Sequence, residues 1–339
     1  MRISGMRRAV ACLALVAAGT GTADAQQVPD SAFAPAIARP AFAAGAGPVV
    51  LVDEAHTNFH TTDGRYYAFA QLLRRDGYVV RGLREPFTRG SLGGARVLVV
   101  ANALHPRNDN DWILPTPSAF TPDEIAAVEA WVREGGSLLL IADHMPFPGA
   151  ADALGTAFGV AMGNGFAYDS TEQQSRFRFS RANGLLADHP VVNGRGREER
   201  VDSVDSFTGQ AFRLMRPDAQ PLLTLGPGTV LLMPEVAWQF SSLTPRMRAD
   251  GLLHGAVLRH GAGRVAVFGE AAMFSAQLAG PSRSPMGMND PGAPQNVQFL
   301  LNVVHWLTGV LDQAWSESPS GPSDDPRGDV ILKERPPDT

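Results

Sequence analysis

Residues 121–142, TPDEIAAVEAWVREGGSLLLIA, place a helix and a buried strand next to each other. A threonine followed by a proline and two acids is a common start of an α-helix, because the threonine caps free N–H groups and proline fits the first turn. Gly135 and Gly136 predict the end of that helix. The continuous apolar run at 137–142 is typical of a strand buried on both faces. This stretch therefore predicts one helix–strand unit of a parallel sheet.

The same alternation extends in both directions along the chain. Further helices are predicted at 66–76, 247–259 and 295–307. Short apolar runs predict further strands at 48–53, 78–81, 95–101, 228–233 and 264–269. Residues 163–220 have an irregular sequence pattern, which predicts long loops and some antiparallel strands. Strands that alternate with helices favour an α/β fold with a doubly wound, mostly parallel sheet of the flavodoxin or Rossmann type.

The first 25 residues have the pattern of a secretory signal peptide. Three arginines precede an apolar run at 9–18, and the small residues at Ala23-Asp24-Ala25 suit a cleavage site. The apolar run is shorter than the roughly 20 residues that span a bilayer. We therefore expect a secreted or periplasmic protein that is cleaved near Ala25.

Composition divides the rest of the chain. Residues 26–47 are rich in Ala and Pro and predict a linker, whereas 313–339, which include SESPSGPSDDPRGD, predict a disordered tail. Residues 48–312 are expected to form a single α/β domain. Apolar residues make up 44% of the chain, which is enough for a large core.

Two rare residue types exclude several chemistries. Cys12, the only cysteine, lies in the predicted signal peptide, and Lys333, the only lysine, lies in the predicted tail. The mature domain would then lack a cysteine nucleophile, a thiolate metal ligand and a lysine for Schiff-base or P-loop chemistry. Loss of three arginines and one aspartate with the signal peptide changes the formal charge from -5 to -7. An acidic chain of this kind is a poor candidate for binding nucleic acid or an anionic membrane. No later stretch is apolar enough to predict a membrane span.

Polar side chains follow four of the predicted strands at the points where the strands end. In open parallel sheets, ligands bind at the carboxyl ends of the strands, so we expect these side chains to form one site. The predicted ligand-binding residues are Asp53, His56, Asn58, Asn102, Asp143, His144, Glu270 and Gln277.

Several roles fit these residues. Amides and carboxylates suit a polar ligand such as a sugar or a peptide. A divalent metal, zinc or manganese, could be held by His56, His144 and Asp143, although no standard zinc spacing is present. Candidate catalytic residues are then Asp143, His144 and Glu270, with an acid as general base of a metal-assisted hydrolase. Asp53, Asp143 and Glu270 could instead supply a pair of carboxylates for glycoside hydrolysis. Taken singly, each residue could also simply cap a turn.

Other motifs give weaker signals. The chain contains no nucleophile elbow and no dinucleotide-binding glycine loop. Arginines within 163–220 could reach an anionic group from a lid, although a solvated arginine face is the more common arrangement. These arginines are Arg176, Arg178 and Arg181. The histidines expected to be structural are His189, His254, His260 and His305.

Residues 126–146, AAVEAWVREGGSLLLIADHMP, resemble the core of the class I glutamine amidotransferase-like superfamily. Residues 49–80 and 265–277 resemble a branch of it that looks non-catalytic. That branch includes uncharacterised exported bacterial domains and relatives in gliding-motility ABC-transporter components and in intraflagellar transport. The resemblance covers most of 48–310 and implies a three-layer α/β sandwich.

The resemblance fails at the residue that catalyses reactions in this superfamily. In catalytic members a cysteine follows the strand that matches 137–142, whereas this chain has Ala142-Asp143-His144. The resemblance therefore implies the fold and a site at Asp143 and His144, but neither amidotransferase nor cysteine-peptidase activity. We expect an exported domain that binds a polar small molecule, a sugar, a peptide or another envelope protein. The alternative is a metal-assisted hydrolase at the same strand ends.

Overall fold

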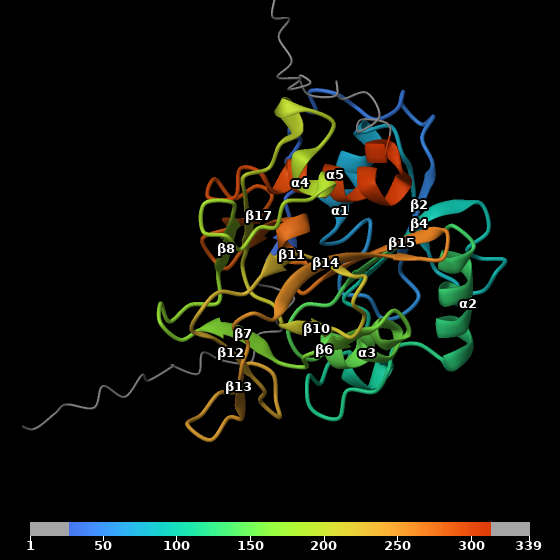
Figure 1. The fold of residues 1–339 in the computed structure, drawn as a ribbon. Coiled ribbons are helices and arrows are strands. Elements are labelled where there is room, and N and C mark those ends of the chain that lie inside the picture. Colours follow the sequence, from blue (N-terminus) through green and yellow to red (C-terminus); the bar gives the residue numbers. More distant parts are fainter. Residues whose placement is uncertain (1–26, 313–339) are drawn as a thin grey trace, which may run out of the picture.

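The computed structural model describes residues 27–312, which build a nine-stranded mixed sheet with helices on both faces (Figure 1). The strands of this sheet are β2 (Val49–Asp53), β3 (Val79–Leu83), β4 (Ala95–Ala101), β5 (Ser137–Ile141), β6 (Val160–Met162), β10 (Phe212–Leu214), β11 (Gln220–Thr224), β14 (Leu253–His260) and β15 (Gly263–Phe268). Five neighbours, in the order β3-β2-β4-β5-β15, run parallel. This is the flavodoxin-like order, in which the first strand of the five lies between the second and the third.

The other half of the sheet is antiparallel. β14 pairs with β15, β10 and β11, and β6 forms the outer edge beside β10. The predicted α/β class is therefore confirmed, while the sheet is mixed and less uniformly parallel than expected. The antiparallel half arises because β14 turns directly into β15 at Gly261, where the left-handed backbone (φ 58°) suits glycine.

Two apolar cores cover the two faces of the parallel half. The helices are α1 (Tyr67–Arg75), α2 (Pro122–Arg133), α3 (Phe147–Ala157), α4 (Pro190–Asn193) and α5 (Asn296–Thr308). Alternate residues of β4 point to opposite faces, as strand geometry requires. Val97 and Val99 pack in the core that contains α1 and α5, whereas Leu98 and Val100 pack in the core of α2 and α3. The result is the expected three-layer arrangement (Figure 1).

Three smaller sheets flank this body. One consists of β7 (Phe166–Asp169), β12 (Thr229–Leu232) and β13 (Arg246–Arg248), and a second of β8 (Phe177–Ser180) and β9 (Ser203–Ser206). The third consists of β1 (Gln27–Pro29), β16 (Ala276–Ala279) and β17 (Ser284–Gly287). The predicted strand at 228–233 therefore exists, but it belongs to a small antiparallel sheet.

Most predicted elements of the parallel half form within a residue or two of their expected bounds, and two predictions elsewhere are wrong. The segment 247–259 is not a helix: it contains β13 and most of β14, which is central in the sheet. Of the linker predicted at 26–47, the described part, 27–47, does not behave as a linker, because β1 pairs with β16 and Phe33, Ile37 and Phe42 pack against the core. Helix α3 is not predicted by the sequence, since Pro148 and two glycines break its pattern.

The predicted signal peptide and the predicted disordered tail lie outside the described residues. Across residues 27–312, we find no helix with the length and hydropathy needed to cross a membrane.

Candidate functional site

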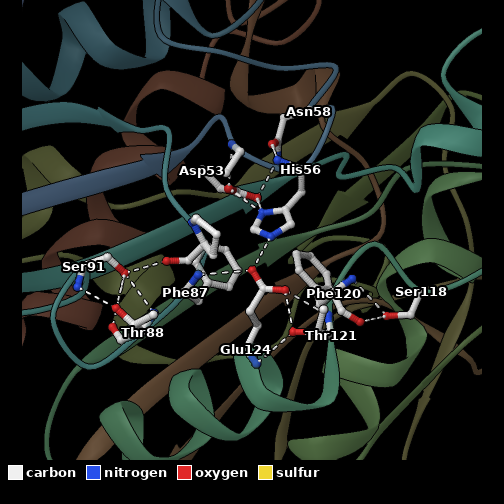
Figure 2. Close-up of polar contacts among 12 residues, drawn as sticks. Asp53, His56, Asn58, Phe87, Thr88, Ser91, Ser118, Phe120, Thr121 and Glu124 are labelled. Atoms are coloured by element: carbon white, nitrogen blue, oxygen red, sulfur yellow. Dashed lines mark hydrogen bonds and ion pairs between the residues drawn. The ribbon is translucent and has the colours of Figure 1, made fainter.

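The carboxyl ends of the parallel strands carry two polar networks, and the first is centred on His56. Its Nδ1 lies 2.8 Å from Asp53 Oδ1, and its Nε2 lies 2.8 Å from Glu124 Oε1 (Figure 2). Asn58 donates to the other Asp53 oxygen (2.9 Å) and accepts from the His56 N–H (2.9 Å). His56 thus joins the end of β2 to the first turn of α2, 68 residues away in sequence.

Glu124 takes part in both the network and the helix cap. Its second oxygen accepts from the Thr121 N–H (2.9 Å) and hydroxyl (2.8 Å), and Thr121 Oγ1 accepts from the Glu124 N–H. This is a complete capping box. Phe87 and Phe120 pack against the imidazole at 4.5 and 4.8 Å between ring centres. The imidazole and both carboxylates are thus bonded inside the protein, which is the pattern of a structural clamp.

The charges of this clamp follow from its hydrogen bonds. Burial would lower the pKa of His56, but the hydrogen bonds and charges of Asp53 and Glu124 outweigh burial and raise it above 6.5. Burial would likewise raise the pKa of Glu124, yet the bonds from Thr121 and His56 lower it to about 2. The two carboxylates therefore favour the imidazolium over the neutral ring.

The second network lies at the ends of β4, β5 and β15. Asn102 has a left-handed backbone (φ 49°), which asparagine adopts more readily than most residues, and its Oδ1 accepts from the Asp143 N–H (2.9 Å). Asn102 Nδ2 lies 3.2 Å from His60 Nδ1. Asp143 Oδ1 accepts from the His144 N–H (2.8 Å) and from the Thr208 hydroxyl (3.1 Å). The turn after β4 is thereby tied to the turn after β5.

Glu270 lies beside Asp143 as a buried carboxyl group. Burial, and then the charge of Asp143, raise the pKa of Glu270 well above its ordinary value, although three backbone N–H groups lower it. Two of those bonds come from Ala272 (2.9 Å) and Met273 (2.7 Å). The same two acids raise the pKa of the buried Tyr66 phenol, second to burial itself. The carboxyl group of Glu270 is therefore harder to ionise than a solvated one, and it caps the turn that follows β15.

His144 lies apart from both networks, inside a box of aromatic rings. Phe166 stacks on its ring at 4.5 Å, Trp238 meets it edge-on at 4.6 Å, and Trp112 and Phe147 lie at 5.8 Å. Nδ1 is 2.7 Å from the Met145 carbonyl and donates to it. Burial lowers the pKa of His144, with only partial opposition from Asp143 and Met145. The ring is thus neutral near pH 7, with the lone pair on Nε2.

Outward from His144, two loops carry most of the exposed large apolar side chains. We call Ile113, Leu114, Trp238, Phe240 and Leu243 the aromatic surface; among the described residues the one other such side chain is Met215. The two loops are tied together by bonds from Leu114 N to Glu235 O (2.9 Å) and from Ala237 N to Trp112 O (2.8 Å). Trp238 is 50% exposed and has a left-handed backbone (φ 66°), which is a genuine outlier for a bulky residue.

A small cavity of about 280 Å³ opens in the second of these loops. Glu235, Gln239, Ser241 and Thr244 supply polar groups to its wall, and Leu243 supplies apolar surface. The carboxyl edge of β5 is therefore bordered by exposed rings and by hydrogen-bonding side chains on one loop.

The structure places seven of the eight predicted ligand-binding residues at this edge and buries most of them, whereas Gln277 lies on β16. Four of them, Asp53, Asn102, Glu270 and Gln277, are at most 1% exposed, and His56, Asp143 and His144 are 6–8% exposed. They divide into the His56 clamp, the Asn102–Asp143–Glu270 network and the His144 box. Gln277 stands apart from all three and donates to Ser275 Oγ (2.7 Å). Most of these side chains are therefore part of the packed interior at the edge of the sheet. The exposed side chains of the aromatic surface are not predicted from the sequence.

The metal-ligand set expected from the sequence is not assembled. Both His56 nitrogens are engaged by carboxylates, whereas His144 lies among aromatic rings beside Asp143. Within residues 27–312, no group of three or more His, Cys, Asp or Glu side chains could hold a metal ion. The donor geometry therefore gives no support to a zinc or manganese hydrolase at His56, His144 and Asp143.

The three arginines considered for an anion-binding lid form ion pairs instead. Arg176 binds Asp290 (2.8 Å), and Arg178 binds Asp205 (3.0 Å) across the β8–β9 pair. Arg181 binds Asp188 at 2.9 Å. The Arg176–Asp290 pair joins the irregular segment 163–220 to the loop before α5, whereas the other two pairs lie within that segment.

Neither the bond of Glu124 to His56 nor the aromatic surface is predicted from the sequence. In the sequence Glu124 is recognisable only as a helix-start acid, and nothing local joins it to His56. The cluster Trp238-Gln239-Phe240 is a detectable signal, because exposed loops rarely carry two aromatic residues so close together.

Comparison with known proteins bears on the fold. No protein-family model matches the chain, and no curated protein matches it. Among solved structures, the mmIFT52 N-terminal domain has a TM-score of 0.54 at 15% identity, over 76% of this chain and 97% of that one. A putative ThuA-like protein from Bacteroides uniformis has a TM-score of 0.44 at 12% identity, over 81% and 94% of the two chains. A putative GMP synthase protein from Thermoplasma acidophilum has a TM-score of 0.41 at 8% identity, over 80% and 98%. The fold is thus shared with the mmIFT52 N-terminal domain, in agreement with the resemblance to relatives in intraflagellar transport.

Proposed function

We propose that this chain is an exported member of the amidotransferase-like superfamily, without cysteine after cleavage of its signal peptide, that binds a saccharide on the aromatic surface. The observation that carries the proposal is the gathering of exposed apolar side chains on two joined loops at the carboxyl edge of β5. Exposed patches of this kind mark binding sites more often than they mark ordinary protein surface. The location is also the edge at which open α/β sheets bind ligands.

A sugar fits this combination of groups better than a wholly polar or a wholly apolar ligand. A pyranose ring has an apolar C–H face that can stack on Trp238 or Phe240, whose rings are 50% and 43% exposed. Its hydroxyl groups both donate and accept hydrogen bonds, as do the hydroxyls of Ser241 and Thr244 and the amide of Gln239 that line the neighbouring cavity. The cavity, at about 280 Å³, is near the lower end of the roughly 300–1,000 Å³ range of small-molecule sites.

The buried residues would act as supports in this proposal. His144 stacks on Phe166 and meets Trp238 edge-on, so its proposed role is to position these two rings. The His56 clamp fixes the adjoining loop to α2. Catalysis is not part of the proposal, because the carboxyl groups of Glu270 and Asp53 are enclosed and bonded to the protein itself.

Titration calorimetry against soluble cello-, chito- and malto-oligosaccharides tests the proposal. We expect saturable binding of at least one series, weakened about tenfold or more by Trp238→Ala, since such a change removes roughly 1–2 kcal/mol of stacking and burial. Met215→Ala is the matched control, because Met215 is a 69% exposed apolar side chain outside the surface. Absence of binding across all three series, or equal effects of the two substitutions, would contradict saccharide binding here. Binding of an envelope protein that Trp238→Ala abolishes would instead support the surface but not this ligand.

A further inference from the structure

A further cavity lies away from the carboxyl edge of the sheet. It has a volume of about 560 Å³ and is enclosed by the start of α4, the start of β11, the end of β14 and the end of α5. Because β14 ends where β15 begins, with His260 opposite Gly263, this cavity lies at the amino end of the parallel strands. It is therefore separate from the aromatic surface.

One wall of the cavity is apolar. It is lined by Trp306, Pro190, Val257 and Leu311. The His189 ring meets the indole edge-on at 5.7 Å. A planar apolar body could lie against such a wall.

The charged groups around the cavity leave one cation unpaired. Asp218 is bound by Arg216 at 2.5 Å, and Asp312 is bound by Arg264. Within residues 27–312 the exposed Arg259 side chain forms no hydrogen bond or ion pair. A guanidinium without a partner at the mouth of a cavity is suited to bidentate binding of a carboxylate.

His189 adds a neutral donor beside that cation. Its Nδ1 accepts from the Val191 N–H (3.1 Å), which leaves the proton on Nε2. Burial, with opposition from Asp188 and help from Arg264, lowers the pKa of His189 to about 4. The ring therefore stays neutral near pH 7. Arg259 is then the one cation among the lining residues, and the lining carboxylates Asp218 and Asp312 are each paired with an arginine.

We propose that this cavity is a second binding site, for a small organic anion that joins a planar apolar body to a carboxylate. The body lies against Trp306, and the carboxylate faces Arg259 at the cavity mouth. The site is independent of saccharide binding, since none of its lining residues belongs to the aromatic surface. Its volume is within the roughly 300–1,000 Å³ typical of small-molecule sites.

Ligand-observed NMR on the whole mature chain, with 2-naphthoate and its neutral amide as probes, tests the proposal. We expect saturable binding of the anion, at least about tenfold tighter than that of the amide. Arg259→Ala should remove that preference. Arg107→Ala should preserve it, because Arg107 is an exposed arginine in the loop after β4, at the opposite edge of the sheet.

A second variant distinguishes binding inside the cavity from binding to the charge of Arg259 alone. Gln220→Trp, at the exposed start of β11, places a bulky ring in the cavity and should reduce anion binding even with Arg259 intact. The proposal is overturned if the anion and the amide bind equally, if neither binds, or if Arg107→Ala weakens binding as much as Arg259→Ala.

Discussion

At the scale of single residues, His56 has the most clearly defined role. Its side chain is 8% exposed. One ring nitrogen bonds the buried Asp53 carboxylate, and the other bonds the Glu124 carboxylate. His56→Ala should lower the free energy of unfolding by about 3 kcal/mol or more, because it leaves two buried carboxylates without that donor. His105→Ala is the control, since His105 accepts one bond from the Arg107 N–H and should cost about 1 kcal/mol. Urea unfolding measures both, and equal losses would argue against the clamp.

The same residue gives a signed dependence on pH. The folded-state pKa of His56 is raised above its unfolded value of 6.5, so its contribution is fully present below pH 6.5. That contribution is lost as the pH rises through the folded pKa. The difference in unfolding free energy between wild type and His56→Ala should therefore shrink as the pH rises from 6.5 through the raised folded-state pKa. A difference that grows over this range would show that the neutral ring is the bound form.

At the scale of elements, the capping box of α2 connects the start of that helix to the His56 clamp. Thr121→Ala removes the side chain that accepts from the Glu124 N–H and donates to the Glu124 carboxylate. The expected loss is about 1–2 kcal/mol, at the upper end for an N-cap because Glu124 also serves His56. Thermal unfolding should show a lower midpoint for Thr121→Ala than for Thr88→Ala, a change in an exposed loop. A midpoint shift no larger than that of the loop variant would contradict the joint role.

The junction of α2, β5 and β15 depends on a close backbone approach. A Cβ at Gly263 would lie 2.1 Å from the carbonyl oxygens of Gly136 and Val132. Gly263→Ala should therefore cost about 3 kcal/mol or more, because backbone atoms must move. Gly196→Ala is the matched control, since nothing lies within 4 Å of a Cβ there. Chemical denaturation measures both. Similar unfolding free energies of the two variants would show that the backbone at this junction can move aside at little cost, which contradicts the prediction.

The sequence reveals those elements whose signals are local. The run at 137–142 and the Thr121 cap predict β5 and α2 correctly, because burial on both faces and N-capping leave marks in a short window. β14 is mistaken for a helix, since its apolar residues reflect pairing with β15 and β11 and not a single face. The strand-end residues are found, but their burial and the bond from His56 to Glu124 depend on contacts distant in sequence.

At the scale of the whole molecule, the predicted signal peptide implies that the protein is exported. Cleavage after Ala25 would leave β1 intact, since that strand begins at Gln27 and pairs with β16. Expression of the full chain in a bacterial host should yield a periplasmic protein that begins at Gln26, as read by mass spectrometry. A full-length protein that remains in the cytoplasm would remove the export proposal but not the binding proposals.

The central claim concerns where the molecule binds its ligand. Hydroxyl-radical labelling, with and without the tightest-binding oligosaccharide, reports the solvent exposure of each aromatic side chain. We predict strong protection of Trp238 and Phe240 and unchanged labelling of Met215, which is exposed elsewhere. Saturating sugar that leaves Trp238 and Phe240 fully labelled would contradict the account.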